Sequence, residues 1–374
     1  MSSIALFHAY GDAATEAAAL AVLRSSQIAS GPKVAEFQLA LQPWLGLPHA
    51  VTTSDMSSAM LLALHGCGVG AGDEVLSPAY TCLSSAAPIA NLGAKPRWVD
   101  VDPATGLLDP VALRGRITAR TKACVVYHAA GYPAAMPAIA AICREHGIAL
   151  IEDCNTALGA RLHGQAVGAW GDAAVYSFYP NRQVNGIEGG AVAWRDPAQA
   201  QRAQRLRRFG IALSGFRDTI GEINAASDIA EVGWSAALSQ LNSAVALAQL
   251  PTLGARLQVT RVNAEWLAGR LAGLPGLTVI APGHGAEPSY WCLLALAERR
   301  DAVLAELKRQ GVMASKLHHR VDSYIGFAAD RVDLPGTAAF LDRVIALPCG
   351  HWLDETALDR VVTALIRALQ ETQG

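Results

Sequence analysis

The run IALIEDCNTALGA, from Ile148 to Ala160, is a short apolar segment that meets two acids, and GDAAVYSFYPNRQVNGIEGGAVAW, from Gly171 to Trp194, follows shortly after it. Both apolar segments have the length and continuity of strands that are buried on both faces. Carboxylates are costly to bury alone, so we expect Glu152 and Asp153 to be either solvated or beside a cationic group. The pattern indicates an open α/β sheet with a ligand site beyond the carboxyl ends of its strands.

The rest of the first half continues the same alternation of short apolar runs and helical patterns. Strands are predicted at His49–Thr53, Glu74–Ser77, Arg97–Val99, Ala123–Tyr127, Ile148–Ile151, Ala173–Ser177 and Gly190–Trp194. Helical patterns separate several of them, at Ser57–His65, Ser84–Asn91 and Ala134–His146. This alternation is typical of βαβ units and predicts an α/β fold with a mostly parallel seven-stranded sheet sandwiched by helices.

The second half is mainly helical. A long Ala- and Leu-rich helix is expected at Ala236–Arg270, with an interruption near Pro251 because proline removes a helical hydrogen bond. The end of the chain mixes both kinds of element. Strands are predicted at Leu277–Ile280, Tyr290–Ala297 and Val344–Leu347, and helices at Asp301–Gln310 and Asp354–Gln370. We therefore predict a large domain over residues 1–250 and a smaller α+β domain over residues 251–374.

Composition excludes several classes of partner. The chain has 374 residues and a net charge of -2, which argues against nucleic acid or an anionic membrane as a partner. We find no apolar run of about 20 residues, so no membrane span is expected. The seven cysteines are scattered, with no C-x-x-C pair, and the N-terminal MSSIALFHAYGD has no basic region. We expect reduced thiols in a cytoplasmic protein.

Polar residues follow most of the predicted strands, at the edge where open α/β sheets bind ligands. Ser54–Ser58 opens a helix whose N–H groups suit a phosphate, although ordinary capping explains the same residues. Tyr80 and Thr81 follow the second strand and His128 follows the fourth, where a plain turn or a structural histidine explains each of them alone. Glu152–Thr156 after the fifth strand and Ser177–Gln183 after the sixth bring the number of such strand ends to five, and together they predict a site.

In the order of these motifs the chain resembles the DegT/DnrJ/EryC1/StrS family of sugar aminotransferases, which use pyridoxal phosphate (PLP). Besides the two opening stretches, the resemblance rests on SGPKVAEF at Ser30–Phe37, GAGDEVLSPAYT at Gly70–Thr81, YHAAGYPAAM at Tyr127–Met136 and ALPCGHWLDETALDRVV at Ala346–Val362. It implies aminotransferase fold type I. It also implies a dimer, because the family forms homodimers with sites at the subunit interface.

The resemblance implies a role for each matching position. Asp153 matches the carboxylate that pairs with the pyridinium nitrogen of the cofactor and keeps its ring an electron sink. Thr156 stands where the family usually has Gln or His near the phenolic oxygen. Ser177 matches a phosphate-binding serine, and Ser57 matches the threonine of a Gly-Thr pair at the phosphate-binding helix.

The departures from the family concern the same site. Arg182 stands at the position of the Schiff-base lysine, and a guanidinium, which is always protonated, can neither form an imine nor relay a proton. Met56 replaces the glycine of the phosphate turn, and Cys82 replaces an aromatic residue that stacks on the ring. Ser235 and Ala237 replace an asparagine and an arginine of the family, of which the asparagine reaches the neighbouring subunit's phosphate.

The chain has few lysines that could take over the lost role. They are Lys33, Lys95, Lys122, Lys308 and Lys316. Lys33 and Lys316 lie in segments that approach the family's active site, but the geometry of the family points elsewhere.

Three hypotheses follow. In the first, the chain is a lysine-free enzyme of amino- or deoxy-sugar or secondary-metabolite biosynthesis that holds PLP or pyridoxamine phosphate non-covalently. Its substrate would be a small molecule such as a nucleotide sugar or an amino acid, with Arg182 binding a carboxylate or phosphate and His128 or Tyr80 carrying protons. In the second, it is a non-catalytic partner that forms a heterodimer with an active paralogue. In the third, the emptied pocket works without PLP and Arg182 anchors an anion.

Overall fold

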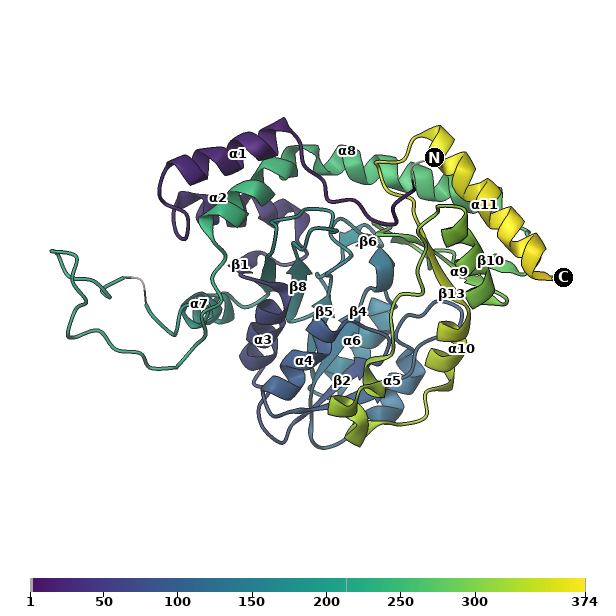
Figure 1. The fold of residues 1–374 in the computed structure, drawn as a ribbon. Helices are drawn as coiled ribbons and strands as arrows, with labels where there is room; N and C mark the ends of the chain where they lie inside the picture. Colours follow the sequence, from purple (N-terminus) through teal and green to yellow (C-terminus); the bar gives the residue numbers. More distant parts are fainter. Residues whose placement is uncertain (1–2, 213, 374) are drawn as a thin grey trace.

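The computed structural model of the protein describes residues 3–212 and 214–373, and a seven-stranded sheet in the order β1-β9-β8-β5-β4-β2-β3 forms its centre (Figure 1). The strands are β1 (His49–Thr53), β2 (Glu74–Pro78), β3 (Lys95–Val99), β4 (Thr121–Tyr127), β5 (Ala149–Asp153), β8 (Ala173–Ser177) and β9 (Gly190–Trp194). The five strands from β8 to β3 run parallel, and β9 is antiparallel to both of its neighbours. The mostly parallel sheet expected from the sequence is confirmed.

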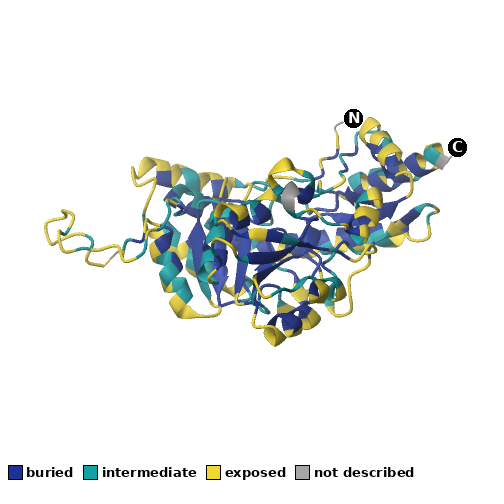
Figure 2. Cartoon of the chain, turned by 90° about the horizontal axis from the view of Figure 1, so that it is seen from below, coloured by how far each residue is buried: buried dark blue, intermediate teal, exposed yellow. Residues whose placement is uncertain are grey.

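Helices cover both faces of this sheet because its strands are apolar on both. In β4, Val125 packs on the side of α3 (Met56–Gly66), α4 (Leu83–Asn91) and α7 (Pro197–Leu206). Its neighbours Cys124 and Val126 pack on the side of α5 (Pro110–Arg116) and α6 (Met136–Glu145). Figure 2 shows the resulting buried sheet between helices whose outer faces are exposed.

Helix α8 (Gln240–Leu271) is continuous through Pro251, so the interruption expected there is wrong. Pro251 is exposed, while Leu250 and Leu253 beside it are buried in the core. Helices α1 (Ala13–Arg24) and α2 (Pro32–Leu41) pack along α8, and this tertiary packing outweighs the lost hydrogen bond. Helix α8 crosses residue 250, and the division of the chain into two domains there stays a prediction.

The C-terminal part adds a second, antiparallel sheet of β10 (Leu277–Val279), β12 (Leu293–Ala297) and β13 (Val344–Leu347). Helices α9 (Arg300–Arg309), α10 (Pro335–Arg343) and α11 (Glu355–Gln373) belong to this part. The N-terminal segment returns to it, where Ile4 forms a bridge with Val312. Short strands and 3-10 helices complete the fold, at β6 (Arg161–Leu162), β7 (Gln165–Ala166), β11 (Ala286–Glu287), Gln42–Trp44, Ala129–Gly131, Val321–Ser323 and Ile325–Asp330.

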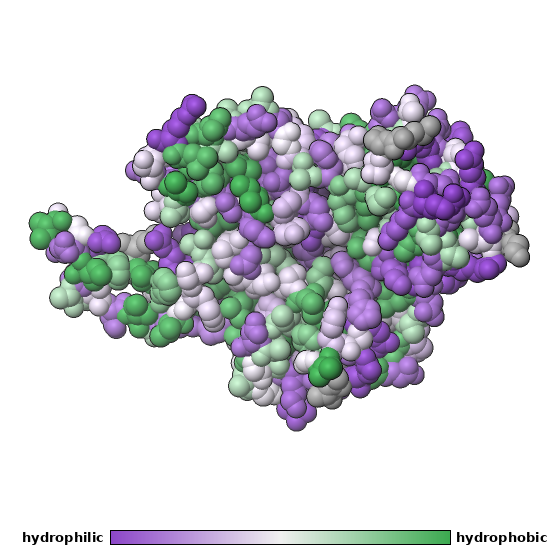
Figure 3. All heavy atoms as spheres, viewed as in Figure 1, coloured by the Kyte–Doolittle hydropathy of each residue, from purple (hydrophilic) through white to green (hydrophobic). Residues whose placement is uncertain are grey.

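Residues 214–232, which we call the arm, extend away from the body of the protein (Figure 1) and return to it at Glu231, whose carboxylate pairs with His65 of α3 and Arg202 of α7. A bridge between Arg217 and Ile223 turns the chain back on itself. Ile220 and Val232 are each 81% exposed, and Figure 3 shows several apolar residues along the arm. The sequence pattern did not predict this extension.

Two expectations from composition concern the whole chain. Within the described residues, no helix combines the length and the apolar character that crossing a membrane requires. All seven cysteines are free thiols, five of them buried in the protein.

Candidate active site

Asp153 lies at the floor of the candidate site, as the last residue of β5 and directly opposite Tyr127 of β4. Its carboxylate accepts hydrogen bonds from Ser85 Oγ at 2.5 Å and from the backbone and side-chain amides of Asn155 at 3.1 and 2.9 Å. The side chain is fully buried, and this burial raises the pKa of Asp153 despite the three bonds. A buried carboxyl group with a raised pKa at a strand end is typical of functional sites.

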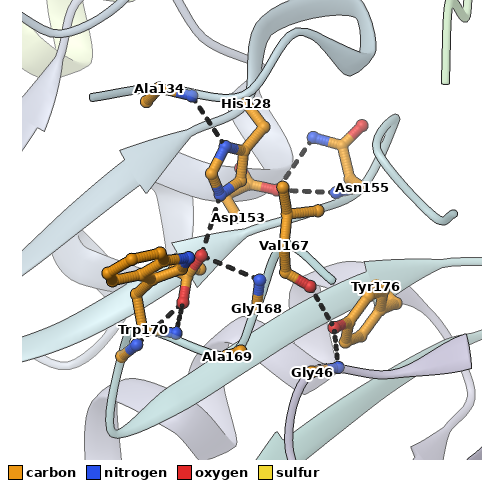
Figure 4. Close-up of polar contacts among 12 residues, drawn as sticks. Gly46, His128, Ala134, Asp153, Asn155, Val167, Gly168, Ala169, Trp170 and Tyr176 are labelled. Atoms are coloured by element: carbon orange, nitrogen blue, oxygen red, sulfur yellow. Dashed lines mark hydrogen bonds and ion pairs between the residues drawn. The ribbon is translucent and has the colours of Figure 1, made fainter. Parts of the chain in front are cut away.

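Successive side chains of a strand point to opposite faces, so Glu152 lies on the other side of β5 from Asp153. Figure 4 shows its neighbours His128, Gly168 and Trp170. Its carboxylate accepts hydrogen bonds at 2.7–2.8 Å from the backbone N–H groups of residues 168, 170 and 171. His128 Nε2 lies 3.0 Å from the same carboxylate, and His128 Nδ1 accepts a bond from the Ala134 N–H at 3.1 Å. Both acids are therefore buried rather than solvated, and they are held mainly by N–H and O–H donors. His128, which is cationic only when protonated, is the basic group beside Glu152.

Arg182 lies in the loop after β8, with its guanidinium carbon 4.7 Å from the centre of the Trp291 ring. One terminal nitrogen donates to Asn181 Oδ1 at 2.5 Å, while the buried Nε has no partner among the described residues. Burial raises the pKa of the Cys82 thiol to about 12. The positive charge of Arg182 lowers this pKa, and the negative charge of Asp153 raises it further. Cys82 therefore lies within the electrostatic reach of both charged groups.

His318 also lies in this pocket and was not among the residues predicted from the sequence. Its Nε2 is 3.2 Å from the Tyr127 hydroxyl and 3.7 Å from Cys82 Sγ, and its ring centre is 5.7 Å from that of Tyr80. Burial, together with the charge of Arg182, lowers the pKa of His318 to about 4. The residue lies in an irregular segment between α9 and α10, where only the His-His doublet could have signalled it.

The part of the site predicted to bind a phosphate, which we call the phosphate end, is the N-terminus of α3. Met56 and Ser57 are the first two residues of this helix. Asp55 caps this helix, and its carboxylate accepts from the backbone N–H and the hydroxyl of Ser58, each at 2.8 Å. Glu188 is close enough for the charge of Asp55 to add to burial in raising the pKa of its carboxyl group. Two carboxylates therefore stand where the sequence comparison suggested an anion.

The remaining predicted residues surround the same strand ends. Thr156 is buried, and its hydroxyl donates to the backbone oxygen of His128 at 3.2 Å. Ser177 ends β8, and its Oγ accepts from the Tyr179 N–H at 3.3 Å. Tyr80 is buried with its ring 4.9 Å from that of Phe340, and burial raises its pKa well above the usual value.

The two lysines singled out from the sequence form ion pairs with nearby acids. Lys33 pairs with Glu36 at 2.5 Å, and Lys316 pairs with Asp301 at 3.2 Å. Their side chains are 41% and 56% exposed, whereas Asp153 is fully buried. Both amines are therefore engaged with carboxylates at partly exposed positions.

A mostly parallel seven-stranded sheet with a buried carboxylate at the end of a central strand defines an α/β protein of the aminotransferase fold. The model of the DegT/DnrJ/EryC1/StrS aminotransferase family matches residues 10–366, and the chain belongs to this family.

Several relatives and solved structures are similar to this chain over almost their whole length. The dTDP-3-amino-3,4,6-trideoxy-alpha-D-glucose transaminase of Streptomyces venezuelae is 31% identical over 358 residues, which cover 94% of this chain and 91% of the relative. The sugar aminotransferase CalS13 from Micromonospora echinospora has a TM-score of 0.92 at 30% identity, covering 97% of this chain and 99% of its own. Spr1654 from Streptococcus pneumoniae, solved in its PLP-form, has a TM-score of 0.91 at 22% identity, with 99% of each chain covered. This last likeness shows the fold alone.

Proposed function

We propose that the chain is a lysine-free relative of the sugar aminotransferases that binds a small molecule of amino- or deoxy-sugar or secondary-metabolite biosynthesis. In this proposal it does not catalyse ordinary transamination. The observation that carries it is the position of Arg182, beside Trp291 and within electrostatic reach of Cys82 and His318 in the pocket above Asp153. A permanently protonated guanidinium at this point cannot capture an aldehyde as an imine.

The relatives and the family point to PLP as the cofactor of such a pocket, and the residues of this chain fit it only in part. Asp153 offers a buried carboxylate for a pyridinium nitrogen. The phosphate end disagrees, because the carboxylates of Asp55 and Glu188 would repel a dianion there. Met56 adds a side chain where the family has none. The residues present do not fit a phosphate-bearing cofactor, so we derive no chemical step from it and propose that any PLP or pyridoxamine phosphate is held without a covalent bond.

The hydrogen bonds of the predicted proton carriers distinguish His128 from the residues that lie in the pocket beside Arg182. Both ring nitrogens of His128 are engaged by Glu152 and the Ala134 N–H, so we assign His128 a structural role. Tyr80 lies beside His318 in the pocket, although its raised pKa holds the hydroxyl proton firmly near neutral pH. His318 is neutral at that pH and can accept a proton, but its lowered pKa makes it a weak base there.

A second candidate is a non-catalytic subunit that pairs with an active paralogue. It is favoured by the exposed apolar residues of the arm, because apolar side chains that project from a protein mark surfaces for association. We propose that the protein works as a dimer, formed either by two copies of this chain or by this chain and a paralogue. The second candidate predicts that this chain forms a stable complex with a lysine-bearing homologue and changes the PLP-dependent activity of that homologue. The first candidate predicts neither.

The proposal is tested by borohydride reduction of the purified protein after incubation with PLP, followed by peptide mass spectrometry. We expect no pyridoxyl adduct on any of the five lysines. A stoichiometric adduct on one of them would overturn the proposal.

Two variants report on the rest of the pocket. Arg182→Lys supplies an amine at this position. The same change combined with Asp55→Ser and Met56→Gly also removes one of the two carboxylates and the methionine side chain at the N-terminus of α3, and leaves Glu188 in place. We expect the near-ultraviolet and visible absorbance of an internal aldimine only in the triple variant. Colour in the single variant would show that Asp55 and Met56 do not hinder the cofactor.

A further inference from the structure

A small cavity lies next to Arg182, on the side of the loop that faces α8 and the segment after β13. Arg182, Gln183 and Arg256 line it together with the aromatic residues Trp291 and Trp352. Its volume is about 40 Å³. A water molecule needs roughly 10–15 Å³ measured in this way, so the cavity has room for about three waters or for the three heavy atoms of a carboxylate. Exposed His8 is part of the wall, so the cavity reaches the surface.

The lining of this cavity is positively charged. Among the described residues that form it there are two arginines and no aspartate or glutamate. Arg256 donates to the backbone oxygens of Gln183 and Gln249 at 2.7 and 3.1 Å, which satisfies N–H groups without neutralising the charge. Burial and the charge of Arg256 lower the pKa of His351 in the same wall to about 4, as a positive environment requires. Asp12, outside the lining, acts on the charge of Arg256, but no carboxylate lines the cavity itself, and its two cations favour an anionic ligand.

Three residues of the lining carry a buried polar atom that has no hydrogen-bond partner in the described structure. They are the donors Arg182 Nε and Trp352 Nε1 and the acceptor Gln183 Oε1. The orientation of Gln183 is fixed, because its Nε2 donates to the Thr156 backbone oxygen at 2.7 Å. Arg182 is likewise held, by its contact with Trp291 and its bond to Asn181 Oδ1. Each such atom costs about 1–3 kcal/mol when it stays unpaired, so the set is suited to a ligand.

We propose that this cavity binds the carboxylate of a small hydroxycarboxylate. The carboxylate oxygens accept from Arg182 Nε and Trp352 Nε1, and an adjacent hydroxyl donates to Gln183 Oε1. The charge comes from Arg182 and Arg256. The cavity has room for the three heavy atoms of the carboxylate, and the hydroxyl-bearing carbon lies toward its opening at His8. This deepens the proposed function by naming a substrate class, and it rests on that proposal only in using Arg182 as an anion anchor.

The test is calorimetric titration of the full chain with glycolate, acetate and inorganic phosphate at constant ionic strength. We expect saturable binding of glycolate, several-fold weaker binding of acetate, which lacks the hydroxyl, and still weaker binding of phosphate. No saturable binding of glycolate would mean that water alone fills the cavity and would overturn the proposal. Phosphate binding tighter than glycolate would overturn the assignment of a hydroxycarboxylate.

Variants then locate the binding. Arg182→Gln removes a charged donor and should weaken glycolate about tenfold to a hundredfold, and Trp352→Phe should weaken it about two- to tenfold. Arg114→Gln, at an exposed ion pair with Glu145, is the charge-matched control and should change nothing. Equal affinity in all three variants would place the ligand elsewhere. Trp352→Phe keeps the test valid if Arg182→Gln does not fold.

The two proposals fail separately. If glycolate does not bind and no lysine is trapped by borohydride, only the carboxylate site is wrong. If a lysine of the wild-type protein is trapped, the lysine-free function is wrong whatever glycolate does.

Discussion

The protonation of His318 should be measurable as a pH dependence of the free energy of unfolding. Its pKa falls from 6.5 to about 4 on folding, so between these values the unfolded chain binds a proton that the folded protein does not. The free energy of unfolding should therefore decrease as the pH falls from 6.5 to 4, by about 1.4 kcal/mol per unit and by about 3 kcal/mol at most. Below pH 4 this contribution stays constant.

Urea unfolding of the wild type and of His318→Gln at a series of pH values isolates this effect. The variant should lose the contribution of His318 and keep that of His351, whose pKa is lowered to about 4 as well. Parallel pH profiles for the two proteins would show that His318 is not held neutral in the pocket.

At this scale the sequence predicted the part of the site that follows strands. Asp153 and Ser177 lie at strand ends because alternating strands and helices fix where each strand stops. His318 and Trp291 could not be found in this way, because tertiary packing of the C-terminal part brings them in from distant segments. Asn155 and Ser85 were missed for a related reason: a hydrogen bond to Asp153 requires only a short polar side chain, which has no sequence signature.

Among the secondary-structure elements, β5 depends on Glu152 for its connection to the following loop. This carboxylate accepts from three backbone N–H groups of residues 168–171 and contacts His128. Glu152→Gln replaces one oxygen by an amide that donates, which leaves backbone donors without acceptors in the core. We expect the free energy of unfolding to fall by on the order of 3 kcal/mol or more, measured by urea denaturation.

The matched control is Glu145→Gln, which breaks an exposed ion pair with Arg114. It should cost between about 0 and 1 kcal/mol, because solvent screens such pairs. If both variants lost the same small amount, the buried bonds of Glu152 would not be a major source of stability.

Helix boundaries were predicted well where local signals act alone and poorly where packing decides. α3 begins after Asp55, which caps it as short polar residues do. α8 continues past Pro251 because Leu250 and Leu253 are buried beneath α1 and α2, a contact that no local pattern contains. The two-residue strands β6, β7 and β11 were missed since they are too short to show a period.

For the molecule as a whole, the seven strands of the central sheet were all predicted, because continuous apolar runs separated by helical patterns leave few other arrangements. The arm could not be predicted from the same rules. It contributes no residue to the core, and its exposed apolar side chains, Ile220, Ile223, Ile229 and Val232, favour contact with another surface.

The arm therefore allows a prediction about assembly. The purified chain should sediment as a dimer, and Ile220→Asp combined with Val232→Asp should raise the dissociation constant by on the order of a hundredfold. Burying each of these side chains contributes about 1.5–3 kcal/mol, and an aspartate there loses that gain. Val111→Asp, at an equally exposed valine on α5, should leave the dimer intact. If the wild type sediments as a monomer alone but as a heterodimer with a lysine-bearing paralogue, the arm serves the partner-subunit role; if it stays monomeric with both, the arm is no interface and the apolar residues need another explanation.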